Sequence, residues 1–216
     1  MQIEGLIGKK IEMTQLFSPD GKVTPVTLLE VGPCVVTQIK NQEKDGYQAI
    51  QLGFGHLKPK LLKKPQAGHL KGITQKPRFF REFGYIQEDD EIKLGTKLRV
   101  SEVFSIGEKV QVSGKSKGRG FAGAIKRWGF HGGPKTHGQS DRWRAVGSIG
   151  AGTDPGRVYK GKKMPGRMGG DLLTVKGLEV LEIDTKNNIL KVKGAVPGPR
   201  NSLLIIKKQG LMRNKS

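Results

Sequence analysis

Acidic residues are scarce in this sequence. The 216 residues include 19 Asp or Glu against 39 Lys or Arg, which gives a net charge of +20 and a pI of about 10.1. An excess of this size favours a polyanion as the main partner. Hydrophobic residues make up only 35% of the chain, enough for a modest core in one domain with a long excursion or in two small domains.

Cysteine and long apolar runs are also missing. Cys34 is the single cysteine, so the chain has neither a disulfide framework nor a cysteine-based zinc site. It lies in the apolar run PCVVTQI, which predicts a buried structural thiol. No apolar run approaches the roughly 18 residues that a membrane span needs, and the start, MQIEGLIGKK, lacks the pattern of an export signal. We therefore expect a soluble cytoplasmic protein without a membrane partner.

The segment Gly114–Gly170 differs from the rest of the chain. It contains 16 of the 32 glycines, 13 Lys or Arg and two acidic residues, which is a net charge of +11 in 57 residues. Its large apolar residues follow neither a helical nor a strand period. Fixing each backbone residue costs about 1 to 2 kcal/mol, and more for glycine, which this composition cannot offset. We expect the segment to be ordered by something outside the chain.

The residue types in this segment suit folded RNA. Glycine permits close backbone approach, Lys and Arg neutralise phosphates, and aromatic rings stack on unpaired bases. The alternative is a disordered basic linker, but such linkers are poor in aromatic residues. The candidate phosphate contacts are Lys115, Lys117, Arg119, Lys126, Arg127, Lys135, Arg142, Arg144, Arg157, Lys160, Lys162, Lys163 and Arg167. The candidate stacking residues are Trp128, Phe130, His131, His137 and Trp143, some of which could instead pack within the segment.

Strand and turn signals dominate the rest of the chain. Residues 3–54 and 97–113 are rich in Val, Ile and Thr, and turn residues recur at short spacing. After the basic segment, strands return with a hairpin that turns at Thr185–Asn188. This pattern predicts a mainly β protein, an antiparallel sheet or barrel with the basic segment inserted between two strands.

Residues 56–82 contain eight Lys or Arg and three prolines. We expect two short helices here, near Leu61–Lys64 and Phe79–Phe83, with the phenylalanines packed against the sheet. The acidic cluster Glu88–Glu91 is expected to be a solvated turn, and the terminal Arg213 and Lys215 to be frayed.

Two glycine motifs raise enzyme hypotheses. Gly118–Gly123 has the letters G-x-G-x-x-G of a dinucleotide-binding turn, but no strand directly precedes it, and no strand precedes the acidic Asp141. Gly114-Lys115-Ser116 lacks the glycine that a phosphate-binding P-loop requires five positions earlier, where Lys109 stands. We expect no catalytic residues, no cofactor and no small-molecule substrate.

Metal binding is also not expected. His131 and His137 are six residues apart with no cysteine or paired carboxylate nearby, which is a poor spacing for a metal site. A second alternative is an architectural DNA-binding protein. Competition between duplex DNA and structured RNA would separate that alternative from an RNA-binding protein.

Several blocks of the sequence resemble the bacterial-type ribosomal protein L3 family, universal family uL3. They are MTQLF, VGPCVVTQIK, KDGYQAIQLGFG, GKSKGRGFAGAIKRWGFHGGPKTHG, GSIGAGTDPGRVYKGKKMPGRMGG and VKGAVPGP, which together extend from one end of the chain to the other. The blocks FAGAIKRWGF and GKKMPGRMGG are the most specific.

The resemblance implies a fold and a role in the ribosome. It implies a translation-factor-like antiparallel β-barrel from residues 1–55, 92–113 and 171–210, a small basic insertion with short helices at residues 56–91, and an extended loop at residues 114–170. It further implies a structural role in the large ribosomal subunit, binding of 23S-type rRNA near its 3' end, and early action in subunit assembly. The loop would reach toward the peptidyl transferase centre, and proteins L14 and L19 would be neighbours.

The sequence departs from the family pattern in three respects. Trp143 and Val146 stand where the family usually has His and Pro, within the stretch that the resemblance places at the loop tip, Trp143–Thr153. Ala151 stands where some members carry a methylated glutamine, so this modification is expected to be absent. Lys9-Lys10-Ile11-Glu12 replaces a more usual glycine-containing pattern and is expected to alter a turn without disrupting the barrel.

Overall fold

The computed structural model describes residues 2–86 and 92–210, which divide into two compact units. One unit holds the residues up to Lys115 and from Leu172 onward, and the other holds Ser116–Asp171. These limits lie within two residues of the predicted loop, 114–170. The acidic cluster 88–91 and the terminal Arg213 and Lys215 lie outside the described residues.

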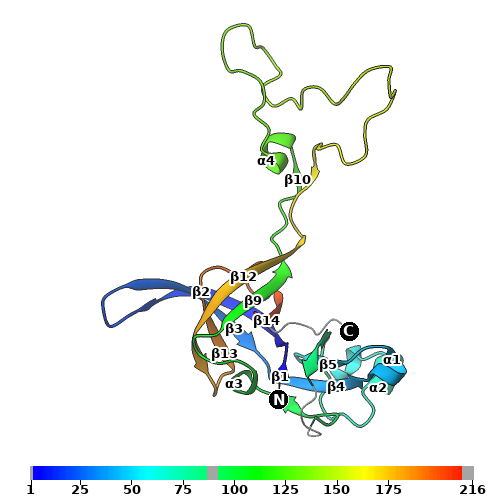
Figure 1. The fold of residues 1–216 in the computed structure, drawn as a ribbon, viewed down its shortest axis with the longest axis vertical. Coiled ribbons are helices and arrows are strands. Elements are labelled where there is room, and N and C mark those ends of the chain that lie inside the picture. Colours follow the sequence, from blue (N-terminus) through cyan, green and yellow to red (C-terminus); the bar gives the residue numbers. More distant parts are fainter. Residues whose placement is uncertain (1, 87–91, 211–216) are drawn as a thin grey trace. The chain divides into compact units, whose positions relative to one another are not determined.

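The first unit is built around a closed antiparallel barrel with the strand order β12-β13-β3-β2-β14-β9. This confirms the predicted mainly β fold with an antiparallel barrel. Figure 1 shows β2 and β3 as a long hairpin whose end, with its short turn at residues 18–22, extends beyond the barrel. The barrel strands are β2 (Gly5–Phe17), β3 (Val23–Val31), β9 (Lys109–Lys115), β12 (Leu172–Asp184), β13 (Ile189–Lys193) and β14 (Leu203–Lys208).

Alternation along the strands fills the barrel. In β14, Leu204 and Ile206 are fully buried while Ile205 between them is half-buried, and in β9 Val110 and Val112 are buried on either side of the half-buried Gln111. Period-2 burial of β-branched and leucine side chains is the pattern of strands with one face on a core. The predicted hairpin at Thr185–Asn188 is confirmed by the ends of β12 and β13.

Residues 9–12 lie within β2, so the prediction of an altered turn there is wrong. The pairing of β2 with β3 shifts by one residue between Lys10 and Glu12, which marks a β-bulge. Lys10 is buried, and its Nζ donates hydrogen bonds to the carbonyl oxygens of Val196 (3.0 Å) and Gly198 (3.2 Å). The bulge therefore places a lysine that binds the connection between β13 and β14.

A second sheet, with the order β6-β5-β4-β8, packs in the same unit. It contains residues 34–54, which the sequence analysis assigned to the barrel. Its core is continuous with that of the barrel through Cys34, Ile50, Phe83 and their neighbours. Its strands are β4 (Cys34–Lys40), β5 (Ala49–Phe54), β6 (Phe79–Phe83) and β8 (Lys97–Leu98), and a short pair joins β1 (Gln2–Ile3) to β7 (Tyr85–Ile86).

Two local predictions in this sheet are wrong. Phe79–Phe83 is the strand β6 rather than a helix, because it pairs along its whole length with β5 and buries Phe83. Val100–Val103, predicted as strand, is the short helix α3, in which Val100 and Val103 are buried three residues apart and Glu102 accepts a hydrogen bond from the backbone N–H of Arg99. The remaining short helices of this unit are α1 (Gln42–Asp45), η1 (Pro59–Leu61) and α2 (Lys64–His69).

Cys34 is fully buried at the start of β4, as predicted for a structural thiol. Its Sγ donates a hydrogen bond to the carbonyl oxygen of Ile7 at 3.5 Å. Burial raises the pKa of the thiol to about 12, and the contact with the Ile7 backbone opposes this only in part. The thiolate that would bind a metal or attack an electrophile is therefore not formed at neutral pH.

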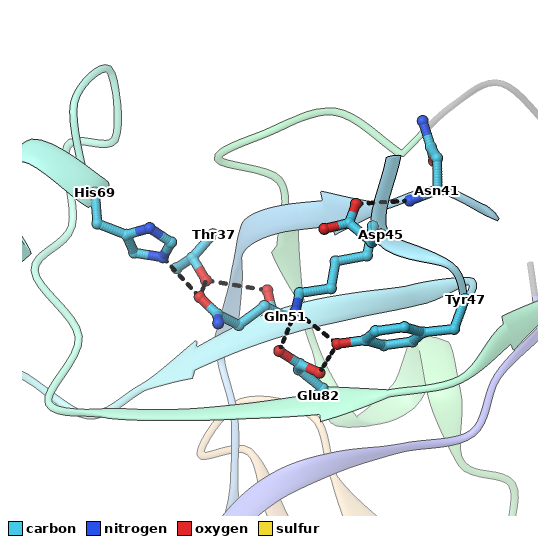
Figure 2. Close-up of polar contacts among 8 residues, drawn as sticks. Thr37, Asn41, Asp45, Tyr47, Gln51, His69 and Glu82 are labelled. Carbon is cyan, nitrogen blue, oxygen red and sulfur yellow. Dashed lines mark hydrogen bonds and ion pairs between the residues drawn. The ribbon is translucent and has the colours of Figure 1, made fainter. Parts of the chain in front are cut away.

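A polar cluster covers one face of the second sheet (Figure 2). Tyr47 donates its hydroxyl hydrogen to Glu82 Oε2 (2.7 Å), and Lys40 Nζ lies 2.6 Å from the Tyr47 hydroxyl and 3.0 Å from Glu82 Oε1. Beside it, Gln51 Oε1 accepts a hydrogen bond from Thr37 Oγ1 at 2.9 Å and lies 2.7 Å from His69 Nε2. The hydrogen bonds from Tyr47 and then from Lys40 hold the pKa of Glu82 below its ordinary value of 4.5.

This lowered pKa predicts an acid-dependent contribution to stability. A carboxylate whose pKa is lower in the folded state stabilises the fold above its unfolded pKa and loses that contribution as pH falls through the folded pKa. Glu82→Gln is therefore expected to unfold at lower urea concentration than the unmodified protein at pH 7, with the difference shrinking toward pH 3. The effect is small because the Glu82 carboxylate is partly exposed to solvent, which screens the interaction. A difference that is constant from pH 7 to pH 3 would contradict this assignment, and Glu43→Gln, exposed on α1, is the control.

Candidate nucleic-acid interface

The second unit begins as a two-stranded ribbon. The strand β10 (Phe121–Ala122) pairs with β11 (Gly166–Arg167). Toward the two ends of the segment, the backbone N–H of Arg119 donates to the carbonyl oxygen of Met168 (2.9 Å) and that of Ser116 to the carbonyl oxygen of Asp171 (2.9 Å). The sequence analysis expected residues 114–170 to lack structure of their own. The ribbon is an exception, because its two arms satisfy each other's backbone groups.

The short helix α4 (Ala124–Trp128) follows β10 and ends at Gly129, whose φ of 74° is in the left-handed region. From its last turn, Arg127 Nη1 and Trp128 Nε1 both donate hydrogen bonds of 2.9 Å to the carbonyl oxygen of Met164. The Arg127 guanidinium also lies 4.8 Å from the centre of the Trp128 ring. These two side chains, predicted as contacts for a nucleic acid, thus connect the two arms of the segment, while 41% of Trp128 stays exposed.

Beyond α4 the chain forms open loops up to β11, with turns but neither helix nor strand (Figure 1). One backbone contact closes the first loop, where the N–H of Gly133 donates to the carbonyl oxygen of Trp143 at 2.9 Å. Half of the Trp143 surface remains exposed. In the second loop the Arg157 guanidinium lies 5.4 Å from the centre of the Tyr159 ring. Such segments have few internal contacts to fix their side chains.

The predicted site residues are accessible almost without exception. Arg127 and Phe130 are half-buried, and the other sixteen are exposed. Lys115 ends β9 in the first unit, and the remaining seventeen lie in the second unit. The structure therefore gathers these side chains in one segment, but as an extended surface and not as a cleft. Ala151 is also exposed.

Ion pairing separates the cations of the two units. All seven ion pairs of the described residues lie in the first unit, among them Lys191 with Glu182 (2.8 Å) and Lys207 with Glu4 (2.8 Å). Among the residues that the structure describes, none of the thirteen Lys or Arg of 114–170 pairs with a carboxylate. A net charge of +11 without internal partners attracts a polyanion with spaced negative charges, as in a nucleic-acid backbone.

The geometry offers no dinucleotide site at Gly118–Gly123. The strand β9 ends at Lys115, the glycines lie in the ribbon, and α4 has five residues instead of the long helix that such a site needs. Among the described residues, no group of three His, Cys, Asp or Glu is arranged to bind a metal, and no helix is long and apolar enough to cross a membrane.

Phe121 was missed as a candidate. It is 80% exposed, more than any other large hydrophobic side chain of the described residues, and it lies on β10 directly opposite Arg167. In the sequence Phe121 lies in the glycine-rich run GRGFAGA, but its exposure depends on which face of the ribbon is covered, which the sequence does not show.

Comparison with known proteins gives consistent matches. The family model described as "Ribosomal protein L3" matches residues 38–187. A protein of Herpetosiphon aurantiacus is 52% identical over 94% of this chain and 95% of its own length, and one of Dehalococcoides mccartyi is 52% identical over 96% and 99%. A protein of Prochlorococcus marinus is 49% identical over 98% and 96%. All three are named "Large ribosomal subunit protein uL3".

Proposed function

Since the chain belongs to the ribosomal protein L3 family, we propose that it is a structural protein of the large subunit of the cytoplasmic ribosome that binds 23S-type rRNA through residues 114–170. Its role is structural and not enzymatic. The observation that carries the RNA-binding part is the separation of charge. Seven cations of the first unit, called the barrel unit from here on, form ion pairs with carboxylates. The cations of residues 114–170 have no carboxylate partner among the described residues.

The finer parts of the proposal come from the family resemblance. They are binding near the 3' end of the rRNA, action early in subunit assembly, approach of the segment to the peptidyl transferase centre, and contact with proteins L14 and L19. The exposed and glycine-rich loops that carry Trp143 and Ala151 are compatible with a path through folded RNA, because glycine lets a backbone approach phosphates closely.

Two charge-matched variants test the RNA-binding part. One replaces six segment cations by glutamine, and the other replaces six cations that form ion pairs in the barrel unit. Binding to an rRNA fragment from the 3' third of the large-subunit RNA is measured across a salt series, with duplex DNA as competitor. The segment variant carries substitutions at Lys117, Lys126, Lys135, Arg144, Lys160 and Lys162, and the barrel variant at Lys9, Lys191, Lys193, Arg200, Lys207 and Lys208.

The segment variant is expected to lower the salt slope, d log K/d log[salt], by about 4 to 5, because each lost phosphate contact removes roughly 0.7 to 0.9. The barrel variant, with the same change in net charge, is expected to keep most of the slope. Equal losses in both variants would show that binding reports net charge alone and would reject the proposed site. Equal competition by duplex DNA would favour the architectural DNA-binding alternative.

A further inference from the structure

The ribbon of the second unit has two different faces. Side chains of directly paired residues in antiparallel strands lie on the same face, and neighbours along a strand lie on opposite faces. Phe121 and Arg167 are paired and share one face, and Ala122 and Gly166 share the other. The second face is covered, because Ala122 is only 4% exposed and a Cβ at Gly166 would meet Arg127 Nη1 at 2.6 Å.

The face with Phe121 and Arg167 is uncovered. Phe121 is 80% exposed and Arg167 is also exposed. Within the described residues, neither side chain makes a hydrogen bond, an ion pair or a ring contact. An aromatic ring is thus placed in solvent opposite an arginine on the hydrogen-bonded ribbon of the segment. The ribbon that carries Phe121 is held by its backbone pairing and by the hydrogen bonds from Arg127 and Trp128 of α4 to Met164.

We propose that Phe121 is a stacking platform for an unpaired RNA base and that Arg167 contacts a phosphate next to that base. This inference rests on the proposed function and adds a binding residue to it. The surroundings favour a base over an apolar protein surface, because Phe121 follows Arg119 and Gly120 and lies opposite Arg167, while its neighbour Ala122 is buried, so no continuous apolar patch forms. An unpaired nucleotide offers the flat face of its base for stacking on a single ring and carries negative charge on its phosphate.

The test uses the full chain and the same rRNA fragment at fixed salt. Phe121→Ala is expected to weaken binding by roughly 5- to 150-fold, the equivalent of one lost base stack of about 1 to 3 kcal/mol. Phe121→Leu is expected to weaken it by a similar factor, since leucine is apolar but has no π-face, and Phe121→Tyr is expected to retain affinity. Phe17→Ala removes another exposed phenylalanine, in β2 of the first unit, and serves as the matched control.

The salt slope separates stacking from charge. Phe121→Ala is expected to leave the slope unchanged, whereas Arg167→Gln is expected to reduce it by roughly 0.7 to 0.9, one phosphate contact. If Phe121→Leu binds as tightly as the unmodified chain, or if Phe121→Ala changes affinity no more than Phe17→Ala, the platform is rejected while the proposed function stands. If the unmodified chain itself lacks salt-dependent binding to the fragment, the proposed function fails first.

Discussion

Replacing residues 117–170 by Asn-Gly is expected to remove most of the salt-dependent affinity for large-subunit rRNA while the first unit stays folded. The deleted part carries twelve of the thirteen cations of the segment. A protein with six to ten phosphate contacts loses roughly three to five decades of affinity between about 50 and 200 mM salt. The shortened chain is therefore expected to show a much flatter salt dependence and weak binding at the lower salt concentration.

The structure indicates how to close the chain. Lys115 and Leu172 are paired across β9 and β12, and the backbone N–H of Ser116 donates to the carbonyl oxygen of Asp171 at 2.9 Å. Two residues can join such a pair in a tight hairpin, for which Asn-Gly is the favoured sequence. The barrel core contains no side chain from 117–170, because its buried cluster consists of residues outside that range. The unfolding midpoint in urea is thus expected to change little.

Two measurements on the shortened chain show whether the segment or the barrel unit binds the rRNA. Titration of the rRNA fragment across the salt series reports the contribution of the segment, and urea denaturation reports the stability of the barrel unit. If affinity and slope are unchanged in a folded variant, the barrel unit carries the binding and the segment needs another role. A variant that fails to unfold cooperatively would show that the two units depend on each other.

The barrel could be predicted from the sequence where one rule decided the structure. Strand and turn signals around Thr185–Asn188 located a hairpin because alternation and turn residues agreed there. The same rules were wrong for Phe79–Phe83, since three phenylalanines within five residues fit a helix face as well as a strand. Only the pairing with β5 decides between them. Such pairing involves residues far apart in the sequence, which local patterns cannot supply.

For the candidate interface, too, the sequence predicted some features and only the fold determined the others. Composition located the segment, because glycine and unpaired cations are properties of the residues themselves. The individual roles of Arg127 and Trp128 could not be predicted, since both depend on the Met164 carbonyl thirty-six or more positions away. Phe121 was not predicted as a contact, but it is exposed because Arg127 covers the other face of the ribbon. A residue's type indicated what it can bind, and the fold determined whether it is free to do so.

Leu204→Ala is expected to destabilise the first unit by about 2 to 5 kcal/mol, the range for truncating a buried leucine. Leu204 is fully buried in β14, between Gly8 of β2 and Gly114 of β9. A Cβ at Gly114 would lie 2.5 Å from Leu204 Cδ2, so the leucine side chain occupies the space that this glycine leaves open. Removing it creates a cavity at the point where the last strand closes the barrel.

Urea denaturation measures this effect, and Leu172→Ala is the matched control. Leu172 is 75% exposed in β12, so its truncation is expected to change stability by no more than about 0.5 kcal/mol. Gly114→Ala adds a second test, because the new methyl group would clash with Leu204 in the unmodified barrel but could enter the cavity left by Leu204→Ala. The double variant is therefore expected to be more stable than the sum of the two single changes predicts. Strict additivity, or equal costs for Leu204→Ala and Leu172→Ala, would contradict this packing. Since β9 and β12 lead directly into the basic segment, the same packing fixes the two chain ends from which that segment extends.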